Sequence, residues 1–145
     1  MARYKNHTKF SGKPVDPSKR IVRYFDLAKN VAFNSGYGKL RHGAVLVKGG
    51  SIINTCFNKD KFCSFGSKFR HRDRGPATIH AELGCVLGIP RDVTTGSDMY
   101  VCRINKAGEF RNSKPCIMCH EVMKHVGIKR VYYTTNEGSI EMYKL

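Results

Sequence analysis

Two short motifs constrain this chain more than any other feature. The first is HAE at residues 80–82, and the second is PCIMC at residues 115–119. Cys116 and Cys119 are three residues apart, so on the first turn of a helix both thiolates can reach one ion. With His80 they make three zinc-type ligands, and three protein ligands leave a fourth position open, as in catalytic zinc sites. The fold must therefore bring two distant helix starts together around one metal.

Glu82 is the candidate for moving protons at such a site. It lies two residues beyond His80, close to the metal but poorly placed to share its ligand face. A zinc ion held in this way lowers the pKa of a bound water to about 7. Taken singly, His80 fits an ordinary core or surface histidine, and the Cys-x-x-Cys pair fits a redox site. The combination of both motifs favours a catalytic zinc site over these readings and over a purely structural zinc site.

Length and composition indicate one folded domain. The chain has 145 residues, of which 41% are hydrophobic, enough for a proper core. Residues 1–15 are polar and basic and predict a loose N-terminal arm, followed by a single domain at 16–145. No apolar run approaches the roughly 18 residues that span a membrane, and no apolar stretch follows the basic N-terminus, as a signal peptide requires. We expect an intracellular protein, cytoplasmic or nuclear, with no membrane partner.

Four of the six cysteines lie outside the PCIMC motif. Because no export signal is present, they are predicted to be small buried hydrophobic residues and not disulfide partners. They are Cys56, Cys63, Cys85 and Cys102.

The formal net charge of +15 is large for a domain of this size. A strongly basic surface favours polyanions such as RNA, DNA or phosphorylated substrates. The alternative is a basic surface that serves only solubility. The charge favours a nucleic-acid or nucleotide partner.

Helical and extended patterns alternate along the chain. The first helix begins at 16–18 and ends at 34–36, with Ile21, Phe25, Ala28 and Ala32 at helical spacing. The other predicted elements are a hairpin of strands at 43–47 and 51–57, a long loop from Asn58 to Thr78, a helix at 79–87, a strand at 99–104, a helix from Pro115 to Gly127, and strands at 128–134 and 139–145. Too few residues follow the fourth strand for a crossover helix, so the fifth strand is predicted to return antiparallel to it.

This order of elements, with HAE opening one helix and PCxxC opening the next, resembles the cytidine deaminase superfamily of zinc-dependent cytidine, deoxycytidylate and polynucleotide deaminases. The resemblance covers residues 21–134 and implies a three-layer α/β fold. Its central mixed sheet has five strands, with helices on both faces and strand five antiparallel to strand four. It also implies hydrolysis of cytosine to uracil with zinc as cofactor, held by His80, Cys116 and Cys119, and with Glu82 as the catalytic residue.

The resemblance also implies substrate contacts. Asn58 matches an asparagine that contacts the sugar or base in this family, although it could simply begin the loop. The backbone around Ala81 is expected to hold the polar edge of the pyrimidine ring. Ser113 and Lys114 directly precede the metal-binding proline–cysteine pair, and Lys114 could reach a phosphate that flanks the target nucleotide.

The first substrate hypothesis is cytosine in single-stranded DNA or RNA. In the long loop, basic residues would follow phosphates while Phe57, Phe62, Phe65 and Phe69 stack on bases, unless these rings anchor the loop to the core. The predicted phosphate-binding residues are Lys59, Lys61, Lys68, Arg70, Arg72 and Arg74. However, the segment at 111–115 lacks the aromatic residue usual in polynucleotide-editing relatives.

Three other readings remain open. One is a free nucleotide deaminase of the deoxycytidylate or cytidine type, which needs only one or two basic residues near its pocket. Another is an adenosine deaminase acting on RNA, although the chain has no room for the longer C-terminal helix of that branch. The third is a nucleic-acid-binding module whose zinc site is inactive, which the intact Glu82 disfavours. The family often assembles, so a homo-oligomer is possible.

Overall fold

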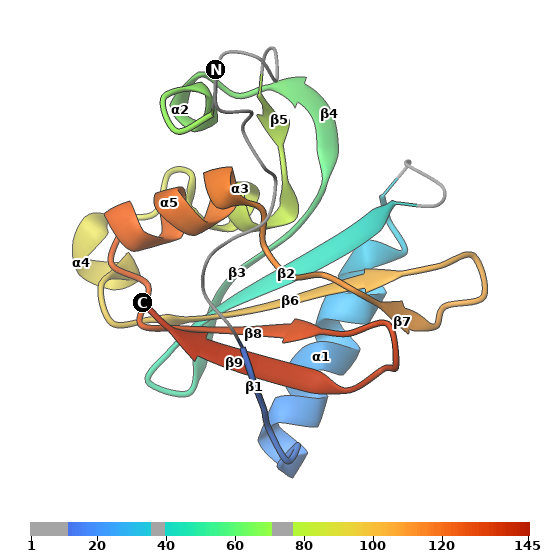
Figure 1. Cartoon of the computed structure of the whole chain (residues 1–145). Coiled ribbons are helices and arrows are strands. Elements are labelled where there is room, and N and C mark those ends of the chain that lie inside the picture. Colours follow the sequence, from blue (N-terminus) through green and yellow to red (C-terminus); the bar gives the residue numbers. More distant parts are fainter. Residues whose placement is uncertain (1–11, 36–39, 71–76) are drawn as a thin grey trace, which may run out of the picture.

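The computed structural model of the chain describes residues 12–35, 40–70 and 77–145 (Figure 1). Its helices and strands are, in chain order, β1 (Lys13–Pro14), α1 (Lys19–Ala32), β2 (Arg41–Lys48), β3 (Ser51–Phe57), β4 (Lys59–Phe62), α2 (Ser64–Ser67), β5 (Thr78–Ile79), α3 (Ala81–Val86), α4 (Arg91–Thr94), β6 (Asp98–Ile104), β7 (Phe110–Arg111), α5 (Ile117–His125), β8 (Arg130–Thr134) and β9 (Ile140–Lys144).

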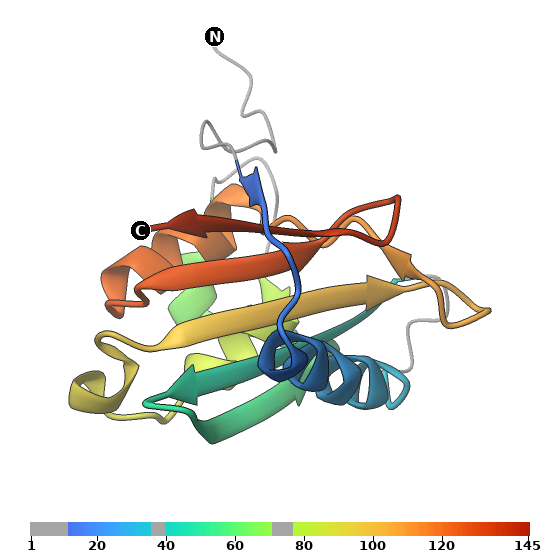
Figure 2. The ribbon, with the colours of Figure 1, turned by 90° about the horizontal axis from the view of Figure 1, so that it is seen from below.

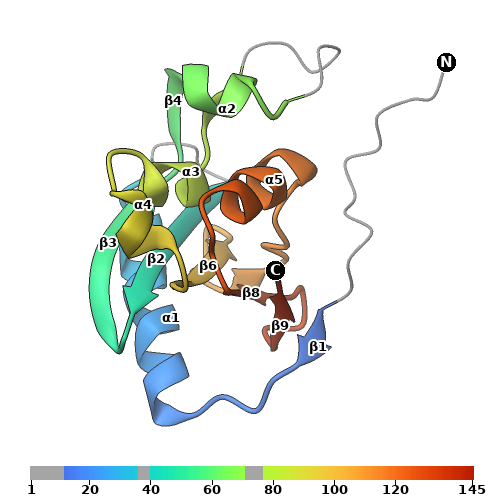
Figure 3. The same ribbon diagram turned by 90° about the vertical axis from the view of Figure 1, so that its left-hand side faces the viewer.

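These elements form three layers around a mixed sheet. α1 covers one face of the sheet, and α3 and α5 cover the other (Figure 3). The sheet order is β1-β9-β8-β6-β2-β3, with β7 paired to β6. β6 and β8 are parallel, and β9 runs antiparallel to β8. The predicted fold class and the direction of the last long strand are therefore confirmed.

The number of strands differs from the prediction. Within the described parts of the chain, the main sheet has seven strands, where the sequence predicted five. The additional strands, β1 and β7, have two residues each, too short to display an alternating pattern. Because β1 pairs with β9, the predicted N-terminal arm contributes Lys13 and Pro14 to the sheet edge, while residues 1–11 lie outside the described residues.

α1 begins and packs as the sequence predicts. The Ser18 hydroxyl caps it by accepting a hydrogen bond from the Ile21 amide at 3.2 Å. Ile21, Phe25, Ala28 and Ala32 are buried against the sheet, and Figure 2 shows the helix lying across this face. A Cβ added at Gly43 would lie 2.0 Å from the Ala28 carbonyl oxygen. Glycine at this position lets α1 approach β2 closely.

The region predicted as one long loop contains regular structure. β4 pairs with β5 in a separate two-stranded sheet, and α2 lies between them. The Cys63 thiol caps α2 by accepting a hydrogen bond from the Gly66 amide at 3.3 Å. Each of these elements has four residues or fewer, so none could show a period in the sequence. α4, which was not predicted, is equally short.

Both motif-bearing helices begin later than predicted. Ile79 belongs to β5, and α3 begins at Ala81, because His80 is an extended N-cap residue with ψ of 159°. α5 begins at Ile117, since Cys116 is likewise an extended N-cap residue with ψ of 168°. The metal-type side chains therefore project from the residues just before the helices or from their first turn.

The four cysteines outside the PCIMC motif are buried free thiols, as predicted. Cys85 lies on the buried side of α3, and Cys102 lies on the α1 side of the sheet. Among the described residues, no helix combines the length and apolar character needed to cross a membrane.

The close approach at Gly43 gives a stability prediction. Gly43→Ala forces β2 away from the backbone of α1 and should lower the free energy of unfolding by about 1–3 kcal/mol. Urea unfolding at equilibrium measures this change. Ser51→Ala, on an exposed position of the neighbouring strand β3, is the control and should be nearly neutral. A Gly43→Ala protein as stable as the wild type would contradict the packing described here.

Candidate active site

Three side chains of the kinds that bind metal ions converge between the starts of α3 and α5, and together they form the metal-type group of the site. The ligand atoms of His80, Cys116 and Cys119 all lie within 4.8 Å of one another. The Nδ1 atom of His80 is 3.7 Å from the Cys116 sulfur and 3.3 Å from the Cys119 sulfur. The structure thus brings together the three residues that the sequence predicted as metal ligands.

This donor set fits zinc. In a tetrahedral zinc site with usual bond lengths, nitrogen and sulfur ligands lie about 3.6 Å apart, close to the two distances observed. Two thiolates and an imidazole are the soft and borderline donors that zinc prefers. Three protein ligands would leave one position for water or substrate.

The protonation of the three ligands is coupled. A hydrogen bond with the Cys119 thiol is the main cause that lowers the pKa of Cys116 to about 4, with His80 adding to it against the effect of burial. Burial raises the pKa of the Cys119 thiol. Burial would lower the pKa of His80, but its hydrogen bond to Cys116 and the charge of that thiolate raise it. The group therefore stabilises a thiolate beside positive charge, the form of cysteine that binds metals.

Glu82 is the buried carboxyl group of the site. It lies on the first turn of α3, and only 5% of its surface is exposed. Burial raises its pKa, and the positive charge of His80 acts in the opposite direction. A carboxyl group tuned upward by burial is suited to both accepting and donating protons near neutral pH.

A cavity of about 350 Å³ opens at the metal-type group. This volume is within the range of small-molecule sites. His80, Glu82 and Cys116 contribute to its wall. The other lining residues are Leu40, His42, Asn58, Lys59, Thr78, Ile79, Ala81, Ser113 and Lys114. All four substrate contacts expected from the sequence therefore lie on the cavity wall.

The Asn58 side chain ties three segments together beside the cavity. Its Oδ1 accepts hydrogen bonds from the Ser35 hydroxyl at 2.7 Å and from the His42 amide at 3.0 Å. Its Nδ2 donates to the Leu40 carbonyl at 2.7 Å. An amide nitrogen carries two hydrogens, so within the described residues one N–H of Asn58 is left for a substrate. His42, which the sequence did not single out, has its Nδ1 3.1 Å from the same carbonyl.

Ser113 is held from behind by the sheet. Its side chain is 3% exposed, and its Oγ accepts a hydrogen bond from the Thr134 amide at 2.8 Å and donates to the Val101 carbonyl at 2.9 Å. The Thr134 hydroxyl donates to the Arg111 carbonyl at 2.7 Å. These bonds fix the segment before Pro115 to the middle of β6 and to the last residue of β8. Thr134 is a supporting residue that no sequence motif indicated.

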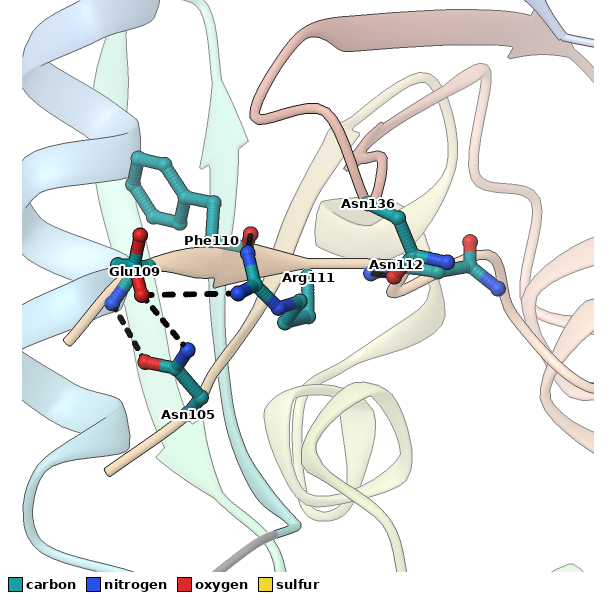
Figure 4. Close-up of polar contacts among 6 residues, drawn as sticks. All are labelled: Asn105, Glu109, Phe110, Arg111, Asn112 and Asn136. Atoms are coloured by element: carbon teal, nitrogen blue, oxygen red, sulfur yellow. Dashed lines mark hydrogen bonds and ion pairs between the residues drawn. The ribbon is translucent and has the colours of Figure 1, made fainter. Parts of the chain in front are cut away.

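The same segment is held at its outer side by asparagines. The Asn112 amide donates a hydrogen bond to the Asn136 side chain at 2.9 Å, and both residues are drawn in Figure 4. The Asn112 side chain in turn accepts a hydrogen bond from the Lys114 amide at 3.2 Å. The backbone at Lys114 is therefore positioned from two directions, and the side chains around the cavity rest on an ordered frame.

The predicted phosphate-binding residues are dispersed. Lys59 lines the cavity, and its Nζ also lies 5.2 Å from the centre of the Phe57 ring. Lys61 and Lys68 are exposed and do not line the cavity, and the half-buried Arg70 contributes to the electrostatics of His80. Arg72 and Arg74 lie outside the described residues.

The phenylalanines interleaved with these basic residues do not act alike. Phe65 and Phe69 pack against the core and meet each other edge to face with centroids 5.4 Å apart. Phe62 is 64% exposed. Two of the rings predicted to stack on bases therefore anchor α2 to the core.

Comparisons with known proteins agree with this site. The family model for the cytidine and deoxycytidylate deaminase zinc-binding region matches residues 18–135. Among solved structures, the apo dCMP deaminase of cyanophage S-TIM5 is similar, with 22% identity and a TM-score of 0.59 over 83% of this chain and 86% of that chain. The same enzyme in complex with dCMP and dUMP has 21% identity and a TM-score of 0.56 over 79% of each chain. These two structures share the fold of this chain. A search of curated protein sequences found no significant match.

The ligand geometry predicts the effect of losing one thiol. Cys116→Ser should reduce bound zinc from about one per chain toward none and lower the melting temperature, since metal affinity contributes to folding. Zinc content by atomic emission and thermal unfolding measure the two effects. Cys102→Ala, which removes a buried thiol on the α1 side, is the matched control and should keep its zinc. Normal zinc content in Cys116→Ser would show that the ligand assignment is wrong.

Proposed function

Because this chain belongs to the family of cytidine and deoxycytidylate deaminases defined by their zinc-binding region, we propose that it deaminates the cytosine of a 5′-phosphorylated pyrimidine nucleotide, as in deoxycytidylate. It is a zinc-dependent hydrolase of the cytidine/deoxycytidylate type. One observation carries the choice of substrate. The cavity that contains His80 and Glu82 is also lined by two lysines, Lys59 and Lys114.

The reaction consumes one water and releases one ammonia. Zinc, held by His80, Cys116 and Cys119, supplies the activation of water for attack on the amine-bearing carbon of the ring. Glu82 accepts one proton from the attacking water and transfers it to the ring nitrogen. It then takes the second proton from the hydroxyl group added to the ring carbon and passes it to the amine, so that ammonia leaves as the carbonyl forms. Its burial at the cavity wall keeps bulk water away from these transfers.

The substrate is oriented by groups on opposite sides of the cavity. Ala81 is the first residue of α3, and the first N–H groups of a helix have no intrahelical partner, so its backbone can bind the polar edge of the base. The remaining N–H of Asn58 faces the sugar or base. Lys59 and Lys114 bind the 5′-phosphate, and the Ser113 hydroxyl supports the wall through its bonds to the sheet.

Cytosine in single-stranded DNA or RNA is the second candidate substrate. The net charge of +15 and the exposed Lys61 and Lys68 support it. The core packing of Phe65 and Phe69 removes two of the rings proposed to stack on bases. A mononucleotide therefore explains more of the residues that line the cavity than a strand does. An adenosine substrate in RNA stays a prediction from the sequence alone.

The proton-transfer role gives a prediction for Glu82. Glu82→Gln should keep about one zinc per chain, because Glu82 is not a ligand, and should lower kcat by about 10²–10⁴-fold, the usual contribution of general acid–base catalysis. Steady-state deamination and zinc content are measured on the same sample. Glu121→Gln, on the exposed side of α5, should keep full activity. A Glu82→Gln enzyme that turns over normally would remove this residue from the mechanism.

The phosphate contacts predict substrate preference. dCMP should be deaminated more efficiently than deoxycytidine or a single-stranded oligonucleotide that lacks a 5′-terminal phosphate, as measured by mass spectrometry of the product base. Lys114→Gln should raise KM for dCMP about tenfold, the equivalent of about 1.4 kcal/mol, with kcat little changed. KM for deoxycytidine, which has no phosphate, should not move. Conversion of the oligonucleotide without conversion of dCMP would replace this proposal by the second candidate.

A further inference from the structure

Three cationic or titratable side chains form a row across the sheet beside the cavity. In the register of β2 and β6, His42 lies opposite Arg103. In the register of β6 and β7, Arg103 lies opposite Arg111. Residues directly opposite one another in a sheet project from the same face. His42, Arg103 and Arg111 therefore share one face over three adjacent strands.

This face is the one that carries the active site. Ala44 and Val101 are two residues from His42 and Arg103 along their strands, and both are buried in the core cluster beneath α3 and α5. Side chains two positions apart in a strand project from the same face. Gly43, which lies between His42 and Ala44, faces α1 on the opposite side of the sheet. The row thus lies at the α3–α5 side of the sheet.

The row also begins at the cavity. His42 is part of the cavity wall, and so is Lys114, three residues after Arg111. Burial is the main cause that lowers the pKa of His42 to about 4. The positive charge of Arg103 lowers this pKa further, so the two side chains interact electrostatically. The guanidinium groups of the row therefore extend a basic surface from the cavity wall to β7.

The positive charge of the row is only partly balanced within the described residues. Glu109 lies 3.5 Å from Arg111, but the same carboxylate oxygen also accepts a hydrogen bond from Asn105 at 3.0 Å (Figure 4). Its side chain is 63% exposed, so this ion pair is weak. In the described part of the chain, the buried Nε of Arg103 has no hydrogen-bond partner. Like charges opposite one another destabilise a sheet, so an external anion would relieve this arrangement.

We propose that Arg103 and Arg111 form a second phosphate-binding site that continues the substrate cavity. The inference rests on the proposed function, in which the first phosphate lies at Lys59 and Lys114. The second phosphate belongs either to the next nucleotide of a strand or to the polyphosphate of a nucleoside triphosphate. Arginine suits this task because its planar guanidinium binds phosphate oxygens in pairs, and the Arg111 side chain is 35% exposed.

The test compares substrates that differ in their second phosphate. Arg103→Gln and Arg111→Gln are assayed on dCMP, dCTP and a 5′-phosphorylated dinucleotide with cytosine first. Each variant should lose about tenfold in kcat/KM on dCTP, on the dinucleotide or on both, the value of one charge-assisted contact, and should keep its value on dCMP. A loss of kcat/KM on dCTP alone identifies the ligand of the second site as a nucleoside polyphosphate. A loss on the dinucleotide alone identifies it as a nucleic-acid strand.

Two outcomes would overturn the second site. One is an equal loss on all three substrates, which would assign the arginines to general catalysis or folding, and the other is no loss on any. Arg23→Gln, on exposed α1 at the opposite face, is the control for net charge and should behave as the wild type. Urea unfolding separates folding from binding, because removal of one of two repelling arginines should leave the unfolding midpoint unchanged or higher.

A binding measurement separates this inference from the proposed function. The affinities of a fluorescent, cytosine-free single-stranded oligonucleotide and of inorganic triphosphate are measured against salt for the same proteins. For at least one ligand, Arg103→Gln and Arg111→Gln should weaken binding, and for the oligonucleotide the salt slope should fall by about one. If the wild type deaminates no cytosine substrate but this dependence is found, the proposed function fails and the anion site stands. If Arg103→Gln and Arg111→Gln bind both ligands as tightly as Arg23→Gln does, the anion site is refuted, whatever the deaminase activity.

Discussion

The common direction of β3, β6 and β8 is the constraint on which the site depends. β2 is antiparallel to both β3 and β6, so β3 and β6 are parallel, and β6 is parallel to β8. Parallel strands need crossover connections, and these place α3 and α5 on the same face. Both helices then begin at the carboxyl end of the sheet, the usual place for a ligand in such folds. His80 and Cys116, the two N-cap residues, meet there for this reason.

Once the helix starts converge, hydrogen bonds determine how firmly the site is held. Ser113 and Thr134 bind the segment before Pro115 to the middle of β6 and the end of β8, while Asn58, which follows β3, binds the beginning of β2. Within the described part of the chain, these three side chains form their hydrogen bonds with other residues than His80, Cys116 and Cys119. They restrict the backbone that carries the metal-type group, so the thiol and imidazole positions are fixed by polar contacts with the strands in addition to core packing.

The sequence predicted two kinds of feature correctly: long elements with a repeating apolar pattern, and the site marked by two motifs of uncommon residues. The period of α1, the β2–β3 hairpin and the order of helices and strands follow from apolar spacing, and the joint occurrence of HAE and PCxxC predicted that His80, Cys116 and Cys119 would come together. The sequence did not predict β1, β4, β5, β7, α2 and α4, because elements of two to four residues have no period to detect. It could not assign the roles of His42 and Thr134, whose partners are distant in sequence and become neighbours only through strand pairing.

The same limit applies to charge. A net charge of +15 indicates a polyanionic or phosphorylated partner, but it cannot say where that partner binds. Of the basic residues that are dense in the sequence at 59–74, Lys59 is the one among the described residues that lines the cavity. Arg103 and Arg111 are eight residues apart with an acidic residue between them, and nothing in the sequence singles them out. Only the register of β6 and β7 sets them opposite one another. In this fold, strand pairing does more than local composition to concentrate charge near the cavity.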